Sequence, residues 1–316
     1  MESTAEDPVS TKYLMRFIWL SIAAALITVT TKGVAAWLTG SVSLLSDALE
    51  SVVNLVAALV AFWALSVSGK PADHNHDFGH GKAEYMSSLA EGAMIFVAAT
   101  AIVWSAIQRF VVPRPIEELG WGLVLSAFAS VLNLVVGLIL IRAGRKHRSI
   151  TLEADGHHLL TDVWTTVGVF VGLGLLVLTG WQWIDPLMAL IVGLNILITG
   201  TKLIRRSAVG LLDAALPQAE VATIRAAVSS VTDDARVVLR DLRTRESGRQ
   251  RFAQAIVVVP GHWTVARSHD LADAIEDAVS QALPTTVTVV HIEPGPSQLP
   301  PTGPFDPPGD AWDVPV

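Results

Sequence analysis

The sequence contains no cysteine and few charged residues: Asp, Glu, Lys and Arg make up 16% of its 316 positions, against about 25% in an ordinary soluble domain. The absence of cysteine excludes disulfide frameworks, thiolate zinc sites, iron–sulfur clusters and cysteine nucleophiles. Any metal site must therefore use His, Asp, Glu or Asn. The net charge of -7 argues against a nucleic-acid-binding protein, because such domains usually carry a basic face.

Hydrophobic residues make up 51% of the chain, and the mean hydropathy is +0.50. Between Phe17 and Ala64 the only formal charges are Lys32, Asp47 and Glu50. A helix needs about 20 apolar residues to cross ~30 Å of hydrocarbon. The pattern predicts an all-α six-helix transmembrane bundle, with spans over residues 14–38, 41–66, 86–112, 119–141, 152–179 and 183–204.

The orientation of these spans follows from the Lys and Arg residues in the short connections, which favour the cytoplasmic side. Basic residues gather after the fourth span and at the end of the sixth: Arg142, Arg145, Lys146, Arg148, Lys202, Arg205 and Arg206. The opposite connections almost lack them. We therefore expect a multi-pass protein of the inner (cytoplasmic) membrane whose N- and C-termini both lie in the cytoplasm.

Composition also divides the chain into segments. We expect a polar N-terminal tail over residues 1–12, the transmembrane domain over 13–208, a small cytoplasmic α+β domain over 209–294 and a disordered Pro/Gly-rich tail over 295–316. The small domain shows the element order αββαβ. Its expected helices and strands cover residues 217–231, 236–245, 251–259, 262–283 and 285–292.

Polar residues inside two of the spans predict a cation site. Glu50 and Asn54 in the second span, and His158 with Asp162 in the fifth, are spaced i and i+4, so each pair lies on one helical face. Two such faces that meet offer carboxylate, amide and imidazole ligands for a divalent ion. The alternative is a set of polar contacts that stabilises the helix bundle.

Asp47 and Asp155 each lie three residues before one of these pairs. An outer ion-relay role and a role in helix capping or solvation are equally compatible with that position.

The connection between the second and third spans, residues 71–84, is rich in His, Asp and Gly. Its glycines allow the backbone to fold so that Asp73, His76 and His80 converge on a metal ion. A solvated, pH-sensitive loop is the alternative. In the small domain, His269, His291 and Glu293 are further candidate ligands, although histidine is also common on protein surfaces.

These residues resemble those of the cation diffusion facilitator (cation efflux) family, and are similar to its bacterial zinc- and iron-efflux members. The resemblance extends from about Leu14 to Pro294. Its most specific parts are residues 41–45, 71–84 with the Phe-Gly-His-Gly-Lys core at 78–82, 152–155 leading to His158 and Asp162, 211–217, and 241–245.

The resemblance implies a homodimer in the lipid bilayer that exchanges a cytoplasmic divalent metal ion for protons by alternating access, with a metallochaperone-like soluble domain. It implies a transport site at Glu50, Asn54, His158 and Asp162 and a loop site at Asp73, His76 and His80. The metal ion, with zinc first and iron, manganese or cobalt as alternatives, is the substrate, and no organic cofactor is expected.

Two further residues take a role from the resemblance. Lys82 and Asp213 match the family's charge interlock between the third span of one protomer and the soluble domain, where the pair can join the two halves of the dimer.

Two departures from the family pattern bear on ion binding. Asn54 stands where zinc and iron transporters usually have Asp, which removes one negative charge from the site and should weaken its hold on a hard divalent ion. Arg240 and Ile256 stand where related sequences often have His, so a two-metal cluster in the soluble domain is not expected.

Functions of other classes fit the sequence less well. A non-transporting membrane metal sensor or partner subunit is favoured if Asn54 cripples ion binding. An intramembrane hydrolase needs a metal-bound water and a general base, and the chain has no H-E-x-x-H or G-x-S-x-G motif. We therefore expect a transporter and not an enzyme.

Overall fold

The computed structural model describes residues 11–39, 42–111, 121–181, 183–232, 234 and 236–295. The chain divides into two compact units: a helical unit up to Ala214 that also contains residues 246–249, and an α+β unit that contains residues 215–245 and the chain from 250 onward. The expected tails, apart from residues 11, 12 and 295, lie outside the described residues.

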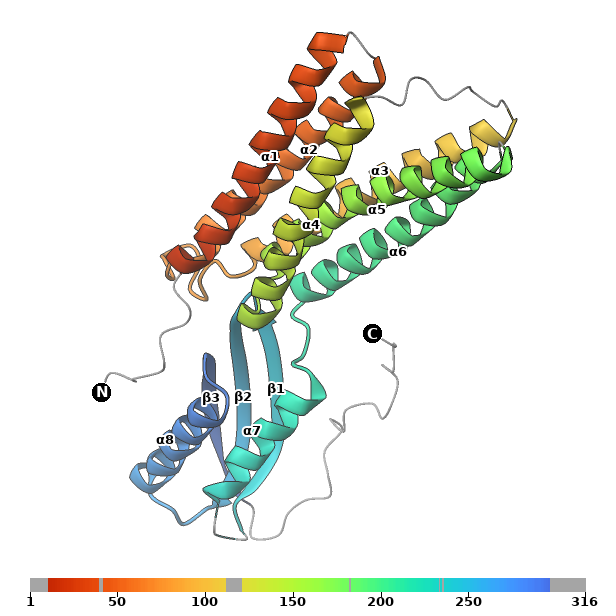
Figure 1. The fold of residues 1–316 in the computed structure, drawn as a ribbon. Helices are drawn as coiled ribbons and strands as arrows, with labels where there is room; N and C mark the ends of the chain where they lie inside the picture. Colours follow the sequence, from red (N-terminus) through yellow and green to blue (C-terminus); the bar gives the residue numbers. More distant parts are fainter. Residues whose placement is uncertain are drawn as a thin grey trace. The chain divides into compact units, whose positions relative to one another are not determined.

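Long helices build the first unit (Figure 1): α1 (Thr11–Thr39), α2 (Val42–Ser68), α3 (Ala83–Val111), α4 (Trp121–His147), α5 (Ile150–Thr179) and α6 (Ile184–Leu211). Within the described residues, five of them are long and apolar enough to cross a membrane. The exception is α5, which has 30 residues and carries Glu153, Asp155 and Asp162 in its first part.

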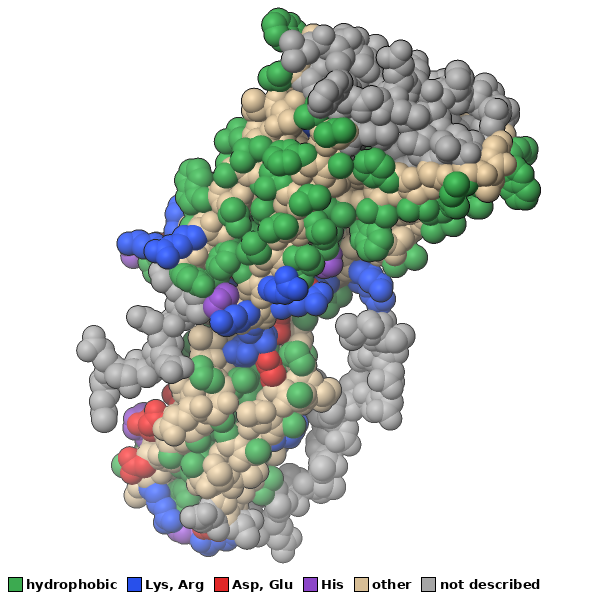
Figure 2. Space-filling model, viewed as in Figure 1, with side chains coloured by type: hydrophobic (Ala, Val, Ile, Leu, Met, Phe, Trp, Pro, Cys, Tyr) green, Lys and Arg blue, Asp and Glu red, His purple; other side chains and the backbone are tan. Residues whose placement is uncertain are grey.

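The surface of the helical unit is apolar. Large side chains such as Trp37, Trp63, Trp104 and Val131 are more than half exposed, and hydrophobic side chains are spread over the described part of the helical unit in Figure 2. A water-soluble monomer rarely exposes so much contiguous apolar surface. The outer face is therefore suited to lipid.

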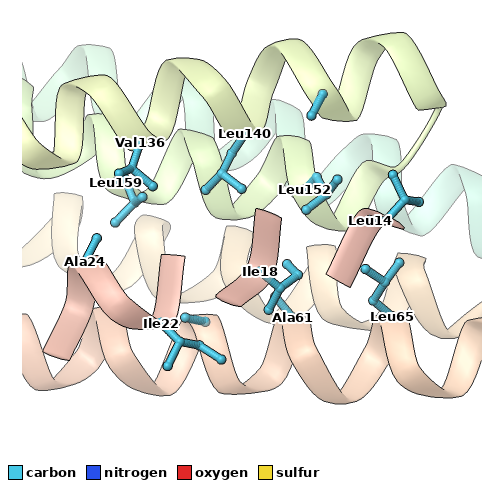
Figure 3. Close-up of a cluster of buried hydrophobic side chains, with 12 residues drawn as sticks. Leu14, Ile18, Ile22, Ala24, Ala61, Leu65, Val136, Leu140, Leu152 and Leu159 are labelled. Carbon is cyan, nitrogen blue, oxygen red and sulfur yellow. The ribbon is translucent and has the colours of Figure 1, made fainter. Parts of the chain in front are cut away.

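Two clusters of buried side chains form the interior of this unit. One includes Ile18 of α1, Leu65 of α2, Leu140 of α4 and Leu159 of α5 (Figure 3). The other joins α3, α5 and α6 through Ile95, Ala99, Ala154, Ile196 and Leu203. Because α5 contributes to both clusters, its polar residues are enclosed by neighbouring helices on several sides.

A glycine pair sets the close approach of α4 and α5. A Cβ atom on Gly156 would lie 2.8 Å from the carbonyl oxygen of Gly137 and 2.7 Å from Cγ1 of Ile141. Only glycine leaves room for the two backbones at this point, a packing device common between membrane helices. It holds the start of α5 against α4, two residues before His158 and six before Asp162.

The α+β unit contains α7 (Gln218–Ser230), β1 (Val238–Ser247), β2 (Gln250–Pro260), α8 (Val265–Ala282) and β3 (Thr286–Gly295). The sheet order is β1-β2-β3, and β2 pairs parallel with β3, Ala255 opposite Val290. A parallel pair needs a crossover, which α8 supplies. The helices bury Ile224, Ile275 and Val279 in a shared core with one face of the sheet.

Candidate metal centres

The polar residues of the second and fifth helices meet inside the helical unit. Asn54 on α2, His158 and Asp162 on α5 are all buried, with 4%, 5% and 9% of their surface exposed. The amide Nδ2 of Asn54 donates a hydrogen bond to Oδ2 of Asp162. The packing of α2 against α5 therefore brings an amide and a carboxylate from two helices into direct contact.

His158 is the group in this cluster that lacks protein partners. Within the described part of the chain, neither its Nδ1 nor its Nε2 has a hydrogen-bond partner. A buried imidazole without partners is costly, and such a group calls for an explanation by a bound ion or water. A metal ion bound beside Asn54 and Asp162 would supply that explanation, because neutral imidazole is a common ligand of divalent metals.

Asn133 on α4 belongs to the same cluster and was not expected from the sequence. Its Nδ2 donates a hydrogen bond of 3.2 Å to Oδ2 of Asp162, and the residue is 2% exposed. Two amides from different helices thus hold one carboxylate oxygen. The signal that was passed over is an isolated Asn in the middle of an otherwise apolar span.

The other predicted residues of the second helix lie in a stretch of α2 whose side chains are outside the described residues. This applies to Glu50 and Asp47. Asp155 is described: it is fully buried on α5, one turn before His158.

The predicted loop site is assembled in the structure. Asp73, His76 and His80 offer ligand atoms that all lie within 4.8 Å of one another. Oδ1 of Asp73 is 3.1 Å from Nδ1 of His76, and Oδ2 is 3.3 Å from Nε2 of His80. Gly79 adopts a positive φ of 76°, which returns the chain so that His80 faces Asp73. One carboxylate and two imidazoles suit a transition-metal ion.

Backbone N–H groups stabilise the ionised form of the Asp73 carboxyl group. Its Oδ1 accepts hydrogen bonds from the backbone N–H groups of Asn75 and His76, each 2.9 Å long. These donors, the Asn75 N–H first, together with the His76 side chain, lower the pKa of Asp73 from its ordinary value of 3.8. The carboxylate is thus ionised over the whole range in which imidazole can bind a metal.

The two interlock residues also meet. Nζ of Lys82, just before α3, lies 3.1 Å from Oδ1 of Asp213 and donates a hydrogen bond of 3.2 Å to the carbonyl oxygen of Leu211. Asp213 follows α6 with a φ of 58°, a conformation that Asp tolerates better than most residues. The pair therefore ties the start of α3 to the end of α6 within one chain.

The candidate ligands of the α+β unit do not gather. His269 on α8 lies 3.6 Å from Asp273, and His291 on β3 lies 3.9 Å from Glu293. Glu293 pairs with Arg240. Among the described residues only the loop triad forms a group of three metal ligands. The expected site at His269, His291 and Glu293 is therefore not assembled within one chain, because α8 and β3 direct their histidines to different carboxylates.

A buried ion-pair network at one end of the helical unit was also missed. Glu84 is 1% exposed and accepts a 2.6 Å hydrogen bond from Ser149, and Nε of Arg249 lies 3.2 Å from its Oε1. Arg148 pairs with Glu246 at 2.7 Å. The sequence offers no periodic signal for such pairs, because the partners lie far apart in the chain.

Two family models match the chain. Residues 18–212 match the model of the cation efflux transmembrane domain, and residues 216–295 match that of the cation efflux protein cytoplasmic domain. Together the two matches cover nearly all of the described chain.

Similar full-length proteins are known in bacteria. The uncharacterized transporter sll1263 of Synechocystis sp. is 48% identical over 295 residues, which cover 91% of this chain and 95% of that protein. The cation-efflux pump FieF of Klebsiella pneumoniae is 33% identical over 261 residues, 82% of this chain and 85% of that pump. A solved structure on the mode of action of CzrB is 35% identical, covers 26% of this chain and 99% of its own, and has a TM-score of 0.24.

Proposed function

The chain belongs to the cation efflux family of membrane transporters, and from that premise we propose that it exports a divalent transition-metal ion from the cytoplasm in exchange for protons. Metal cation efflux is the activity that the family and its relatives support, and it makes the protein a transporter, not an enzyme. Beyond metal cation efflux, we propose the class of ion, the coupling to protons and the alternating-access mechanism.

The observation that carries the proposal is the buried contact between α2 and α5. Asn54 and Asp162 are in direct contact, and His158 lies one turn away with both ring nitrogens unpartnered. We assign the transport site to these three residues with Glu50, one turn before Asn54 on α2. Two carboxylates, an imidazole and an amide oxygen complete a shell without sulfur.

Proton coupling follows from the chemistry of these ligands. A metal ion binds ionised carboxylate and neutral imidazole, so protons compete with it for the same atoms. In our proposal, protons that arrive from the far side load His158 or Asp162 and expel the ion. In this proposal the helices cross the membrane six times, with both termini in the cytoplasm. Movement of the helices around the site opens it alternately to each side of the membrane, as in other transporters whose sites lie near the midplane.

The loop site and the charge pair have supporting roles in this proposal. Asp73, His76 and His80 concentrate metal ions near the helical unit. Lys82 and Asp213 hold α3 and α6 together and contribute to a homodimer, a state supported by the match to the cytoplasmic domain of the family. Zn(II) is the first candidate ion, followed by Fe(II), Mn(II) and Co(II), because carboxylate and imidazole ligands accept all of these.

Reconstitution into vesicles tests the proposal. Metal flux in wild-type vesicles should rise with an imposed pH gradient, and Asp162→Ala should abolish it, because the carboxylate that holds both amides is lost. Asp234→Ala, which removes an exposed carboxylate of the α+β unit, is the control and should transport normally. Flux that ignores the pH gradient rejects antiport, and unchanged flux in Asp162→Ala rejects the site.

One observation favours a second candidate, a membrane metal sensor or partner subunit that binds without transport. The Nδ2 group of Asn54, not its carbonyl oxygen, faces Asp162, so the amide must turn before its oxygen can bind an ion. Tight metal binding without flux in the same vesicles would support that candidate.

A further inference from the structure

A second pair of buried carboxylates lies in the helical unit, away from the residues assigned above. Glu91 on α3 and Asp155 on α5 are both 0% exposed. Charged residues inside membrane helices are costly and are retained mainly for function. Neither the loop site nor the ion-pair network around Glu84 includes them.

Packing brings the two carboxylates toward each other. Glu91, Ile95 and Ala99 follow one face of α3 at i, i+4 and i+8, and Ile95 and Ala99 pack with Ala154, the residue before Asp155. Asp155 is close enough for its charge to act on Glu91. The two side chains are therefore buried near each other where α3 packs against α5.

Three of the four carboxylate oxygens of this pair lack hydrogen-bond partners among the described residues. Within the described chain, Oε2 of Glu91 and both carboxylate oxygens of Asp155 have no hydrogen-bond partner. Ser87 donates a 2.9 Å hydrogen bond to Oε1 of Glu91 and so leaves Oε2 open. The buried hydroxyl of Ser21 on α1 lies close to Asp155.

Two arginines near the start of α5 pair with a different carboxylate. Arg145 and Arg206 both bond Glu153, at 3.2 and 2.7 Å, and so do not reach the next acidic residue of α5. Two like charges in a low-dielectric interior repel strongly and need a cation between them. Three open carboxylate oxygens and a serine hydroxyl provide the oxygen-only ligands that hard divalent ions prefer.

We propose that Glu91 and Asp155 form a second buried cation site, which holds the transported divalent ion one helical turn before the cluster of Asn54, His158 and Asp162. Its role as a staging position rests on the proposed function. The existence of the site does not depend on the proposed function, because ion binding to the purified protein can be measured without transport.

Manganese binding to the full-length protein tests the site. The reference variant carries His158→Ala, His76→Ala and His80→Ala, which disable the other two sites, and bound Mn²⁺ per chain is counted by electron paramagnetic resonance. We expect this variant to retain a bound ion. Adding Glu91→Gln or Asp155→Asn should lower its Mn²⁺ affinity by at least about tenfold.

Glu153→Gln in the same background is the matched control, because it removes a buried carboxylate of α5 that already has two arginine partners. It should leave the Mn²⁺ affinity unchanged. The proposal is overturned if the reference variant binds no Mn²⁺, which is the result expected if the two carboxyl groups only share a proton. It is also overturned if the variants with added Glu91→Gln and Asp155→Asn both bind Mn²⁺ as tightly as the reference variant. If the wild-type protein shows no metal flux but the reference variant still binds Mn²⁺, the proposed transport function is rejected and the second site is not.

Discussion

The amide of Asn54 on α2 donates a hydrogen bond to the carboxylate of Asp162 on α5, and Asn133 on α4 donates to the same oxygen. Three helices are thereby joined at one buried carboxylate. In a chain with Asp at position 54, the same contact would set two negative charges against each other. The amide therefore stabilises the metal-free bundle and reduces the negative charge available to an incoming ion.

Asn54→Asp should strengthen ion binding and weaken the metal-free helix bundle. The added carboxylate should raise the apparent affinity for Zn²⁺ by at least roughly tenfold, because an opposite charge nearby contributes several kcal/mol at an effective dielectric constant near 20 and desolvation of the new charge offsets part of that gain. The same change should lower the melting temperature of the metal-free protein. Flux against metal concentration and thermal unfolding with and without Zn²⁺ check both effects, and an unaltered concentration dependence would place Asn54 outside the ion's reach.

Gly156→Ala should destabilise the helical unit. The new Cβ atom would lie 2.8 Å from the carbonyl oxygen of Gly137, and overpacking of this kind typically costs about 1–3 kcal/mol. Gly174→Ala on the same helix is the control, because nothing lies within 4 Å of its Cβ position. Thermal unfolding should show a lower midpoint for Gly156→Ala alone, and equal midpoints for the two variants would contradict the close approach of α4 and α5.

The loop triad predicts that two histidines of the same loop behave differently. His80→Ala should weaken Zn²⁺ binding to the loop by at least about tenfold, because even outer partners of a metal ligand contribute that much. His74→Ala should have no effect, because His74 is an exposed neighbour outside the triad. Calorimetric titration of the full chain with His158→Ala, Glu91→Gln and Asp155→Asn in the background isolates the loop, and equal losses would argue for a merely solvated loop.

The lowered pKa of Asp73 predicts how acid affects this site. A carboxyl with a lowered pKa keeps its charge, and its contribution to binding, until the pH falls below its ordinary value of 3.8. Loss of Zn²⁺ between pH 7 and 5 should therefore not come from protonation of Asp73. Asp73→Asn should weaken binding equally at pH 7 and pH 5.5; a weakening that disappears at the lower pH would show that Asp73 itself titrates there.

Lys82 and Asp213 should show a measurable but small coupling. Their side chains are 37% and 44% exposed, and pairs this exposed to solvent contribute about 0.2–1 kcal/mol. A double-mutant cycle with Lys82→Gln and Asp213→Asn, followed by thermal unfolding, gives the coupling energy. Asn is chosen because it also tolerates the positive φ at position 213. Additive losses would show that the contact has no energetic role.

Several parts of the site were predictable because they depend on local spacing. The four-residue interval between His158 and Asp162 places both on one helical face whatever surrounds them, and the glycines around Asp73, His76 and His80 favour a compact loop. The structure brings the loop residues within ligand distance of one another. It also places Asn54 against Asp162. Long apolar runs, likewise, predict long helices from length and hydropathy alone.

Other parts depend on which helix faces which. Asn133 and Glu91 looked like isolated polar residues in apolar spans, and nothing in their local sequence indicated Asp162 or Asp155 as a neighbour. His269 and His291 show the converse: they share a ligand chemistry, but within one chain they lie beside different carboxylates.

The sequence by itself determined that this chain is a membrane protein without thiol chemistry, and it located the polar residues that a cation would need, because composition and helical period are local properties. Only the tertiary structure decided which of them meet. Contacts such as Gly137 with Gly156 and Asn133 with Asp162 join residues that are distant in the chain, and helix packing, not spacing, sets their partners.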